Sequence, residues 1–292
     1  MRSSAVVAGR GFDHDTDSPD IHTASDEYAR RFTGGGRVAL IRQAECLEQL
    51  LGSMDAGPLR VLDVGGGHAQ TTELVLEHGH HMVVHGSSES CFRRLVHLSR
   101  AYPDRLTGCA SPLLTLPFAS GSFDLVMALR LMAHVTRWRE LLAEMLRVTR
   151  RYLVIDLPIL GGVQRLAGTL FRLKMRVEGN TRPFFLYNRR DVLHHLQSLG
   201  AELTAEEGEM VLPMALHRIL GNADASMRAE KLLGKAGLRA RWGSPVLMLV
   251  TKSDVPASVD DDWIVPRPPS ESAGLPVTEL PLGTSSSVLR DR

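Results

Sequence analysis

The chain has 292 residues, of which 43% are hydrophobic, and this is enough apolar material for one large domain with extensions. Its formal net charge is +1, so nothing in the overall charge points to nucleic acid or to another strongly charged partner. The N-terminus lacks the apolar core of a signal peptide, and no apolar run reaches the roughly 18 residues of a membrane span.

The first 24 residues are polar and rich in Ser, Asp and Gly, and we expect them to be disordered. Residues 38–54 have apolar positions at helical spacing. From residue 60 onward, short apolar runs alternate with amphipathic stretches. We predict strands at 60–64, 81–85, 123–129 and 152–158, and helices at 70–79, 88–102 and 138–150. Such alternation predicts right-handed βαβ units and a parallel sheet.

The pattern changes after Pro158. We predict helices at 160–176, 191–200 and 214–238, a strand within 201–212, and a last strand at 244–252. From residue 253 the composition shifts to Pro, Ser and Asp, which predicts a disordered tail over 253–292. Three widely spaced cysteines, Cys46, Cys91 and Cys109, show no metal-ligand spacing and suit a reducing compartment, so we expect a cytoplasmic protein without a bound metal.

The stretch Val61–Ala69 (VLDVGGGHA) carries most of the functional information. An apolar strand enters a glycine-rich turn that precedes a helix, at the sheet edge where doubly wound folds bind ligands. Asp63 lies at the strand end, where it can accept hydrogen bonds from an ammonium group or order the loop. A dinucleotide site would have the spacing G-x-G-x-x-G, whereas this chain has Gly65-x-Gly67-x-Ala69. The pattern favours a cationic amino-acid ligand, and an ordinary tight turn stays open as an alternative.

This motif resembles motif I of class I S-adenosylmethionine-dependent methyltransferases of the small-molecule, type 11-like kind. Residues 116–158 resemble the family's LPF…SFD strand, its H-V-x-x-W helix and the strand that follows. Residues 28–32 (YARRF) resemble an N-terminal Y-x-x-R-F element. The resemblance covers roughly residues 25–252. It implies a Rossmann-like, doubly wound, mostly parallel sheet with an antiparallel last strand.

The resemblance also implies a site for S-adenosylmethionine. The loop after motif I would hold the methionine part of the cofactor, the end of the next strand the ribose, and the stretch before LPF the adenine. The end of the SFD strand would face the methyl group, and the N-terminal element would close over the cofactor, with Arg31 pairing its carboxylate. The residues at these positions are Asp63, Gly65, Gly66, Gly67, Gly86, Ser111, Leu113, Arg130, Tyr28 and Arg31.

The chain departs from the family at the end of the second strand. The acid that binds the ribose hydroxyls is replaced by Gly86, although His85 or Glu89 could substitute. The usual Asp before LPF is also missing. Each lost charge-assisted hydrogen bond forfeits about 1.5–3 kcal/mol of affinity. The predicted result is weak cofactor binding or a fold that no longer catalyses methyl transfer.

Two further features have both a functional and a structural interpretation. His134 follows the SFD strand and is either a base for an acceptor hydroxyl or a locally packed residue.

Residues 160–190 combine apolar and basic positions, and together with 211–243 they stand where the family places its acceptor-side insertions. The first insertion would cover an apolar or anionic acceptor, lie on a membrane surface or simply pack on the core. For His217 we favour a structural role.

We therefore expect methyl transfer from S-adenosylmethionine to O, N or C of a small-molecule acceptor. The sequence leaves two alternatives open. One is a catalytically degenerate methyltransferase fold that acts as a binding or partner subunit, which the missing acid at Gly86 supports. The other is a nicotinamide-dependent oxidoreductase, which the glycine spacing disfavours.

Overall fold

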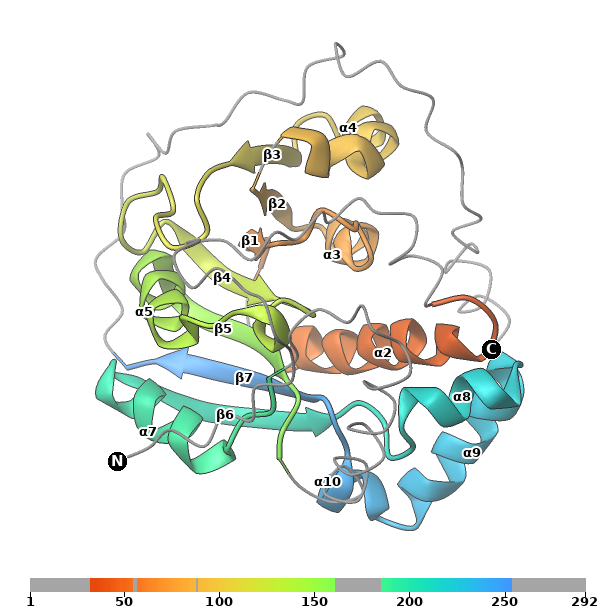
Figure 1. The fold of residues 1–292 in the computed structure, drawn as a ribbon. Helices are drawn as coiled ribbons and strands as arrows, with labels where there is room; N and C mark the ends of the chain where they lie inside the picture. The colour runs from red at the N-terminus through yellow and green to blue at the C-terminus, as the bar shows by residue number, and fades with distance from the viewer. Residues whose placement is uncertain (1–31, 55–56, 88, 161–184, 254–292) are drawn as a thin grey trace.

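The computed structural model describes residues 32–54, 57–87, 89–160 and 185–253. Within these residues the chain forms one sheet with the strand order β3-β2-β1-β4-β5-β7-β6 (Figure 1). Its strands are β1 (Arg60–Val64), β2 (His81–Gly86), β3 (Leu106–Ala110), β4 (Phe123–Ala128), β5 (Thr149–Leu157), β6 (Ala201–Gly208) and β7 (Val246–Lys252).

Strands β1 to β5 pair in parallel, and β7 is antiparallel to both β5 and β6. The predicted doubly wound, mostly parallel sheet with an antiparallel last strand is therefore confirmed. β7 lies between β5 and β6, so β6 forms one edge of the sheet and β3 forms the other. The strand order reverses between β1 and β4, and in this class of fold ligands bind at the carboxyl ends of the strands beside such a reversal.

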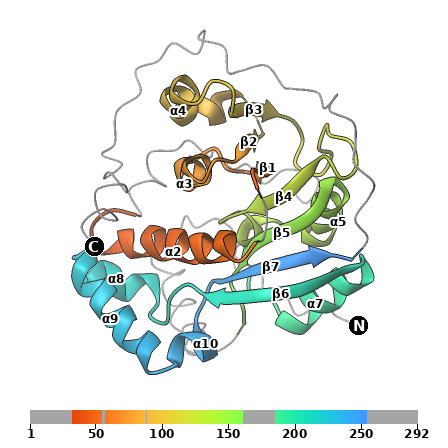
Figure 2. The same ribbon diagram turned by 180° about the vertical axis from the view of Figure 1, so that it is seen from behind.

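Helices cover both faces of the sheet because the central strands are apolar on both sides (Figures 1 and 2). One apolar cluster joins one face to α2 (Val38–Gly52), α3 (Thr72–Glu77) and the pair η2 (Glu89–Leu95) and α4 (Val96–Ala101). The other cluster joins the opposite face to α5 (Trp138–Val148) and α7 (Arg189–Ser198). No helix among the described residues is long and apolar enough to cross a membrane.

Three short helices connect the end of β6 to the start of β7 and therefore lie at the carboxyl edge of the parallel strands. They are α8 (Met214–Leu220), α9 (Ala223–Lys235) and α10 (Leu238–Trp242). Figures 1 and 2 show them together beyond one end of β6. α8 and α9 contact the 3-10 helix η1 (Gly34–Arg37), which leads into α2.

Three sequence expectations differ from this structure. The single helix predicted over 214–238 is broken, because Gly221 and Gly237 adopt left-handed φ values of +66° and +74°. The helix predicted over 88–102 begins as the 3-10 helix η2. β3 was not predicted, and it is short and contains the small and polar residues of LTGCA. The helix expected at 160–176 lies almost entirely outside the described residues.

Candidate active site

The glycine turn after β1 has the geometry of a close backbone approach. Gly65 has a φ of +77°, and its N–H donates to the carbonyl of His85 at 3.0 Å. The turn closes where Ala69 donates its N–H to the carbonyl of Gly66 at 2.9 Å, and Ala69 itself has a φ of +55°. Gly67 is buried between them. The turn therefore holds left-handed backbone at two places beside the strand-order reversal.

Asp63 lies directly beneath this turn. Its side chain is buried, and its Oδ1 atom has no hydrogen-bond partner among the described residues. Burial raises the pKa of Asp63 to about 7, because a charged carboxylate loses its hydration there. A Cβ added to Gly66 would stand 2.0 Å from Asp63 Oδ2, so only glycine fits at that position. The arrangement leaves a buried carboxylate with an oxygen that a cation can use.

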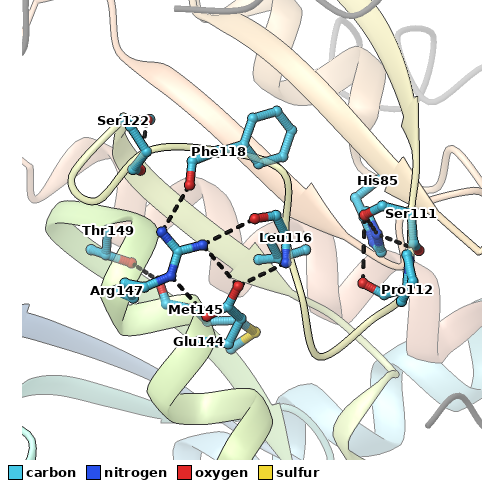
Figure 3. Close-up of polar contacts among 11 residues, drawn as sticks. His85, Ser111, Pro112, Leu116, Phe118, Ser122, Glu144, Met145, Arg147 and Thr149 are labelled. Atoms are coloured by element: carbon cyan, nitrogen blue, oxygen red, sulfur yellow. Dashed lines mark hydrogen bonds and ion pairs between the residues drawn. The ribbon is translucent and has the colours of Figure 1, made fainter.

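The end of β2 carries no acid and has no room for one. A Cβ on Gly86 would lie 2.7 Å from the Cβ of Cys91. His85 points to the opposite side, where its Nε2 lies 3.0 Å from both the carbonyl and the hydroxyl oxygen of Ser111. Ser111 in turn donates its N–H to the carbonyl of Gly86 at 3.1 Å. The structure thus joins Gly86 and Ser111, and Figure 3 shows His85 aimed at Ser111.

His85 is neutral at physiological pH, because burial lowers its pKa to about 4. Its Nε2 faces a carbonyl, so this nitrogen carries the proton, and its buried Nδ1 has no partner in the described part of the chain. His85 therefore offers no charge to a ribose.

Arg130 follows the end of β4 and has a φ of +58°. Its N–H donates to Asp156 Oδ1 at 2.7 Å, and its Nε donates to Gln43 Oε1 at 2.9 Å. Next to it, Leu131 reaches back over the glycine turn, since a Cβ on Gly65 would meet Leu131 Cδ2 at 3.2 Å. The ends of β1 and β4 are therefore in direct contact through Leu131.

A family model described as a methyltransferase domain matches residues 61–151, which include this turn, the end of β2 and the end of β4. Residues 61–151 are therefore similar to a methyltransferase domain. No curated protein matches the chain.

Solved structures of methyltransferases share the fold. One is magnesium protoporphyrin IX methyltransferase from Synechocystis PCC 6803 with bound S-adenosylhomocysteine, which is 15% identical in sequence to this chain. Its TM-score is 0.56, and the alignment covers 80% of this chain and 98% of that one. Another is the 1,6-didemethyltoxoflavin-N1-methyltransferase of Burkholderia thailandensis, which is 16% identical with a TM-score of 0.51. That alignment covers 87% of this chain and 98% of the other. Its structure holds 1,6-didemethyltoxoflavin and S-adenosylhomocysteine.

The structure describes only some of the remaining predicted site residues. Leu113 is buried in the core cluster on the α5 face, so its side chain is directed into the protein. His134 ends η3 (Met132–His134), is half-buried, and donates its N–H to the carbonyl of Leu131. Tyr28 and Arg31 lie outside the described residues, so their expected closure over the cofactor stays a prediction.

A clamp from α5 holds the loop between β3 and β4, and sequence reasoning missed it. Glu144 Oε1 accepts the N–H of Leu116 at 2.7 Å, while the Arg147 guanidinium donates to the carbonyls of Leu116 and Phe118 (Figure 3). Arg147 also pairs with Glu144 at 2.8 Å, and this contact lowers the pKa of the carboxyl group. The loop that follows Ser111 is thereby tied to a helix.

A second missed feature is a buried polar cluster beside Arg130. Gln43 Nε2 donates to Asp156 Oδ2 at 3.2 Å and to Glu209 Oε1 at 3.1 Å. Burial is the main reason why the pKa values of Asp156 and Glu209 are both raised, and for Glu209 the nearby Asp156 carboxylate adds to it. These residues come from α2, β5 and the segment after β6, and no local motif links them.

His217 and Glu230 form a buried pair at the helices that follow β6. His217 is fully buried and contacts Glu230 Oε1 at 3.1 Å, while Glu230 also accepts the N–H groups of Val211 and Leu212. This pair joins α8 to α9, which confirms the structural role favoured for His217. In the described part of the chain, no three His, Cys, Asp or Glu residues gather as ligands for a metal ion.

Proposed function

We propose that this domain binds S-adenosylmethionine at the glycine turn and transfers its methyl group to O, N or C of a small-molecule acceptor. The observation that carries the proposal is Asp63, a buried carboxylate with an unpartnered oxygen beneath a turn that admits no side chain at residue 66. The match of residues 61–151 to a methyltransferase domain makes S-adenosylmethionine the expected occupant.

The residues present fit the amino-acid end of this cofactor. Burial raises the pKa of Asp63, and an ammonium group bound beside it would lower that pKa again by stabilising the charged carboxylate. The glycine turn lets the backbone come close to such a group. Asp63, Gly65, Gly66 and Gly67 would hold the methionine part, with Gly86, Ser111 and Leu113 along the adenosine and Arg130 at the methyl end.

Bound S-adenosylmethionine supplies a sulfonium methyl group that is already activated for displacement. The chain's own contribution is to align the acceptor within about 3–3.5 Å and to exclude water. His134 is the candidate base that takes a proton from an acceptor hydroxyl or amine, because it lies half-buried next to Leu131 at the carboxyl edge of β4.

The acceptor class rests on two comparisons. The two similar methyltransferases described above are named for magnesium protoporphyrin IX and for 1,6-didemethyltoxoflavin, which are small organic molecules. An apolar or anionic small molecule remains our proposal for this chain.

The test is calorimetric titration with S-adenosylmethionine, S-adenosylhomocysteine and NAD. The proposal predicts binding of the first two and none of NAD. Binding of NAD alone would favour an oxidoreductase and overturn the proposal, and so would an absence of binding by all three.

A degenerate, non-catalytic methyltransferase fold is the second candidate, and the packing at Gly86 favours it. Cys91 fills the space that a ribose-binding acid would need. In that case S-adenosylhomocysteine would bind, but no label would pass from methyl-labelled S-adenosylmethionine to a small-molecule extract. Label transfer that stops when His134 is replaced by Ala would favour the enzyme.

We also propose the domain limits and the location. The three cysteines are buried and form no disulfide among the described residues, which supports a reducing, cytoplasmic compartment. We propose residues 25–252 as the domain, with a disordered segment at 1–24 and a disordered tail at 253–292 that carries no catalytic group.

A further inference from the structure

Two residues other than glycine have positive φ values in the described part of the chain, and both lie at the candidate site. They are Ala69, at +55°, and Arg130, at +58°. Left-handed backbone is strained for residues with a side chain, and it persists only where the surroundings hold it in place. Contacts with neighbouring residues must therefore hold Arg130 in this conformation.

Asp156 holds the backbone of Arg130. Its side chain is 3% exposed, and each of its oxygens has a donor. Oδ1 accepts the N–H of Arg130 at 2.7 Å, and Oδ2 accepts Gln43 Nε2 at 3.2 Å. A short hydrogen bond to a buried carboxylate is among the stronger contacts that a backbone N–H can make.

Gln43 holds the side chain of the same residue. Its Oε1 accepts Arg130 Nε at 2.9 Å, and a second guanidinium nitrogen of Arg130 donates to the carbonyl of Ala39 at 3.0 Å. The ring of Phe32 lies 4.4 Å from the guanidinium carbon. One amide group thus connects the Asp156 carboxylate with the Arg130 guanidinium, so that backbone and side chain are fixed together.

The fixed turn matters because of the residue that follows it. Leu131 is buried, and both of its terminal carbons lie 3.2–3.3 Å from the position that a Cβ on Gly65 would take. Any change of φ at residue 130 moves Leu131, and Leu131 lies against the glycine turn.

We propose that Asp156 is a positioning residue for the cofactor, which holds Arg130 in its left-handed conformation and so places Leu131 against Gly65. The Asp156 carboxylate contacts Arg130 and Gln43, and it acts on the glycine turn through Arg130 and Leu131. This inference rests on the proposed function, since it concerns how the same turn is kept in shape for S-adenosylmethionine.

The test compares four proteins in the dissociation constant of S-adenosylhomocysteine and in the melting temperature without ligand. Asp156→Ala removes both acceptors and should weaken binding at least tenfold. Asp156→Asn keeps an oxygen for the Arg130 N–H, and its affinity should stay within about threefold of wild type. Glu230→Gln is the matched control, because Glu230 is equally buried but joins α8 to α9. It should lower the melting temperature without changing the dissociation constant.

A purely structural role for Asp156 predicts a different pattern. Asp156→Ala would then lower the melting temperature as Glu230→Gln does and keep wild-type affinity, and that result would overturn the inference. If Asp156→Ala does not fold, Gln43→Leu decides, since it removes the second partner of both Asp156 and Arg130. It should weaken binding at least threefold, and unchanged affinity would overturn the inference. Absence of binding by the wild type would overturn the proposed function as well, which distinguishes the two failures.

Discussion

Asp63 is buried, and no charged partner for it is found among the described residues, which has a consequence for stability. Its pKa is raised to about 7 in the folded chain, above its ordinary value, so the folded state binds the proton more tightly than the unfolded state. The free energy of unfolding should therefore fall as the pH rises from about 4 to 7 and level off above 7. The size of this effect is at most about 4 kcal/mol.

Asp63→Asn should remove this part of the pH dependence, because asparagine does not titrate. Urea unfolding of both proteins between pH 4 and 8 measures it, with a flatter profile expected for the variant. Asp156 and Glu209 also have raised pKa values, but they are present in both proteins and cancel in the difference. Equal slopes for the two proteins would mean that Asp63 is not a protonated group in the folded chain.

Gly86 marks where the family pattern and this chain disagree, and the structure changes what a substitution should do there. The family pattern predicts that an acid at this position restores ribose binding, but its side chain must first displace Cys91, whose Cβ lies 2.7 Å from the added Cβ. Overpacking of this kind costs about 1–3 kcal/mol.

We therefore expect Gly86→Asp to lower the melting temperature and not to tighten binding of S-adenosylhomocysteine. Gly57→Ala is the control, since nothing lies within 4 Å of a Cβ at residue 57. Thermal unfolding gives the melting temperatures of wild type, Gly86→Asp and Gly57→Ala, and calorimetry gives their affinities for S-adenosylhomocysteine. A Gly86→Asp protein with wild-type stability and tighter binding would show that the β2 end adapts and that the ribose site follows the family.

At the scale of elements, the clamp between α5 and the loop after β3 is the clearest energetic prediction. Glu144→Ala should lower the free energy of unfolding by about 1–3 kcal/mol, because it leaves the N–H of Leu116 without its partner. It should also weaken binding of S-adenosylhomocysteine, since the freed loop is the one expected along the adenine.

The matched control is Glu140→Ala on the same helix. Glu140 pairs with Arg137 at the surface and holds no loop. Its loss should leave both stability and affinity near wild type. Similar effects of the two substitutions would contradict the clamp.

The elements that could be predicted from the sequence are those with a local signal. The apolar run at 60–64 and the amphipathic stretch at 138–150 became β1 and α5 because one short window held the whole pattern. β3 has no such window, since it is an edge strand of small and polar residues. The helix break at Gly221 depends on a left-handed conformation that glycine permits but does not demand.

The candidate site likewise has one part with a local sequence signal and one part without it. The Asp63 turn is contiguous in sequence and was predicted. The cluster of Gln43, Asp156 and Glu209 was not, because its hydrogen bonds join residues 113 and 166 positions apart. Only the sheet order brings these residues together, and a glutamine on an amphipathic helix is usually a solvated residue.

At the scale of the whole molecule, the composition predicts that residues 254–292 can be removed. The last contact before them is the N–H of Ser253, which donates to the carbonyl of Gly200 at 2.9 Å. A chain ending at Ser253 should keep its melting temperature within about two degrees and its affinity for S-adenosylhomocysteine. Differential scanning calorimetry of both lengths measures this, and a large drop would show that the segment packs on the domain.

The glycine turn as the cofactor site is the central claim, and Gly66→Ala tests it most directly. A single methyl group there would stand 2.0 Å from Asp63 Oδ2 and force the turn off the carboxylate. The measurement is the calorimetric dissociation constant of S-adenosylhomocysteine for wild type and Gly66→Ala, with circular dichroism to confirm the fold. The account predicts that the wild type binds and that the variant loses at least tenfold in affinity while keeping its spectrum. Equal affinity in the two proteins would contradict it.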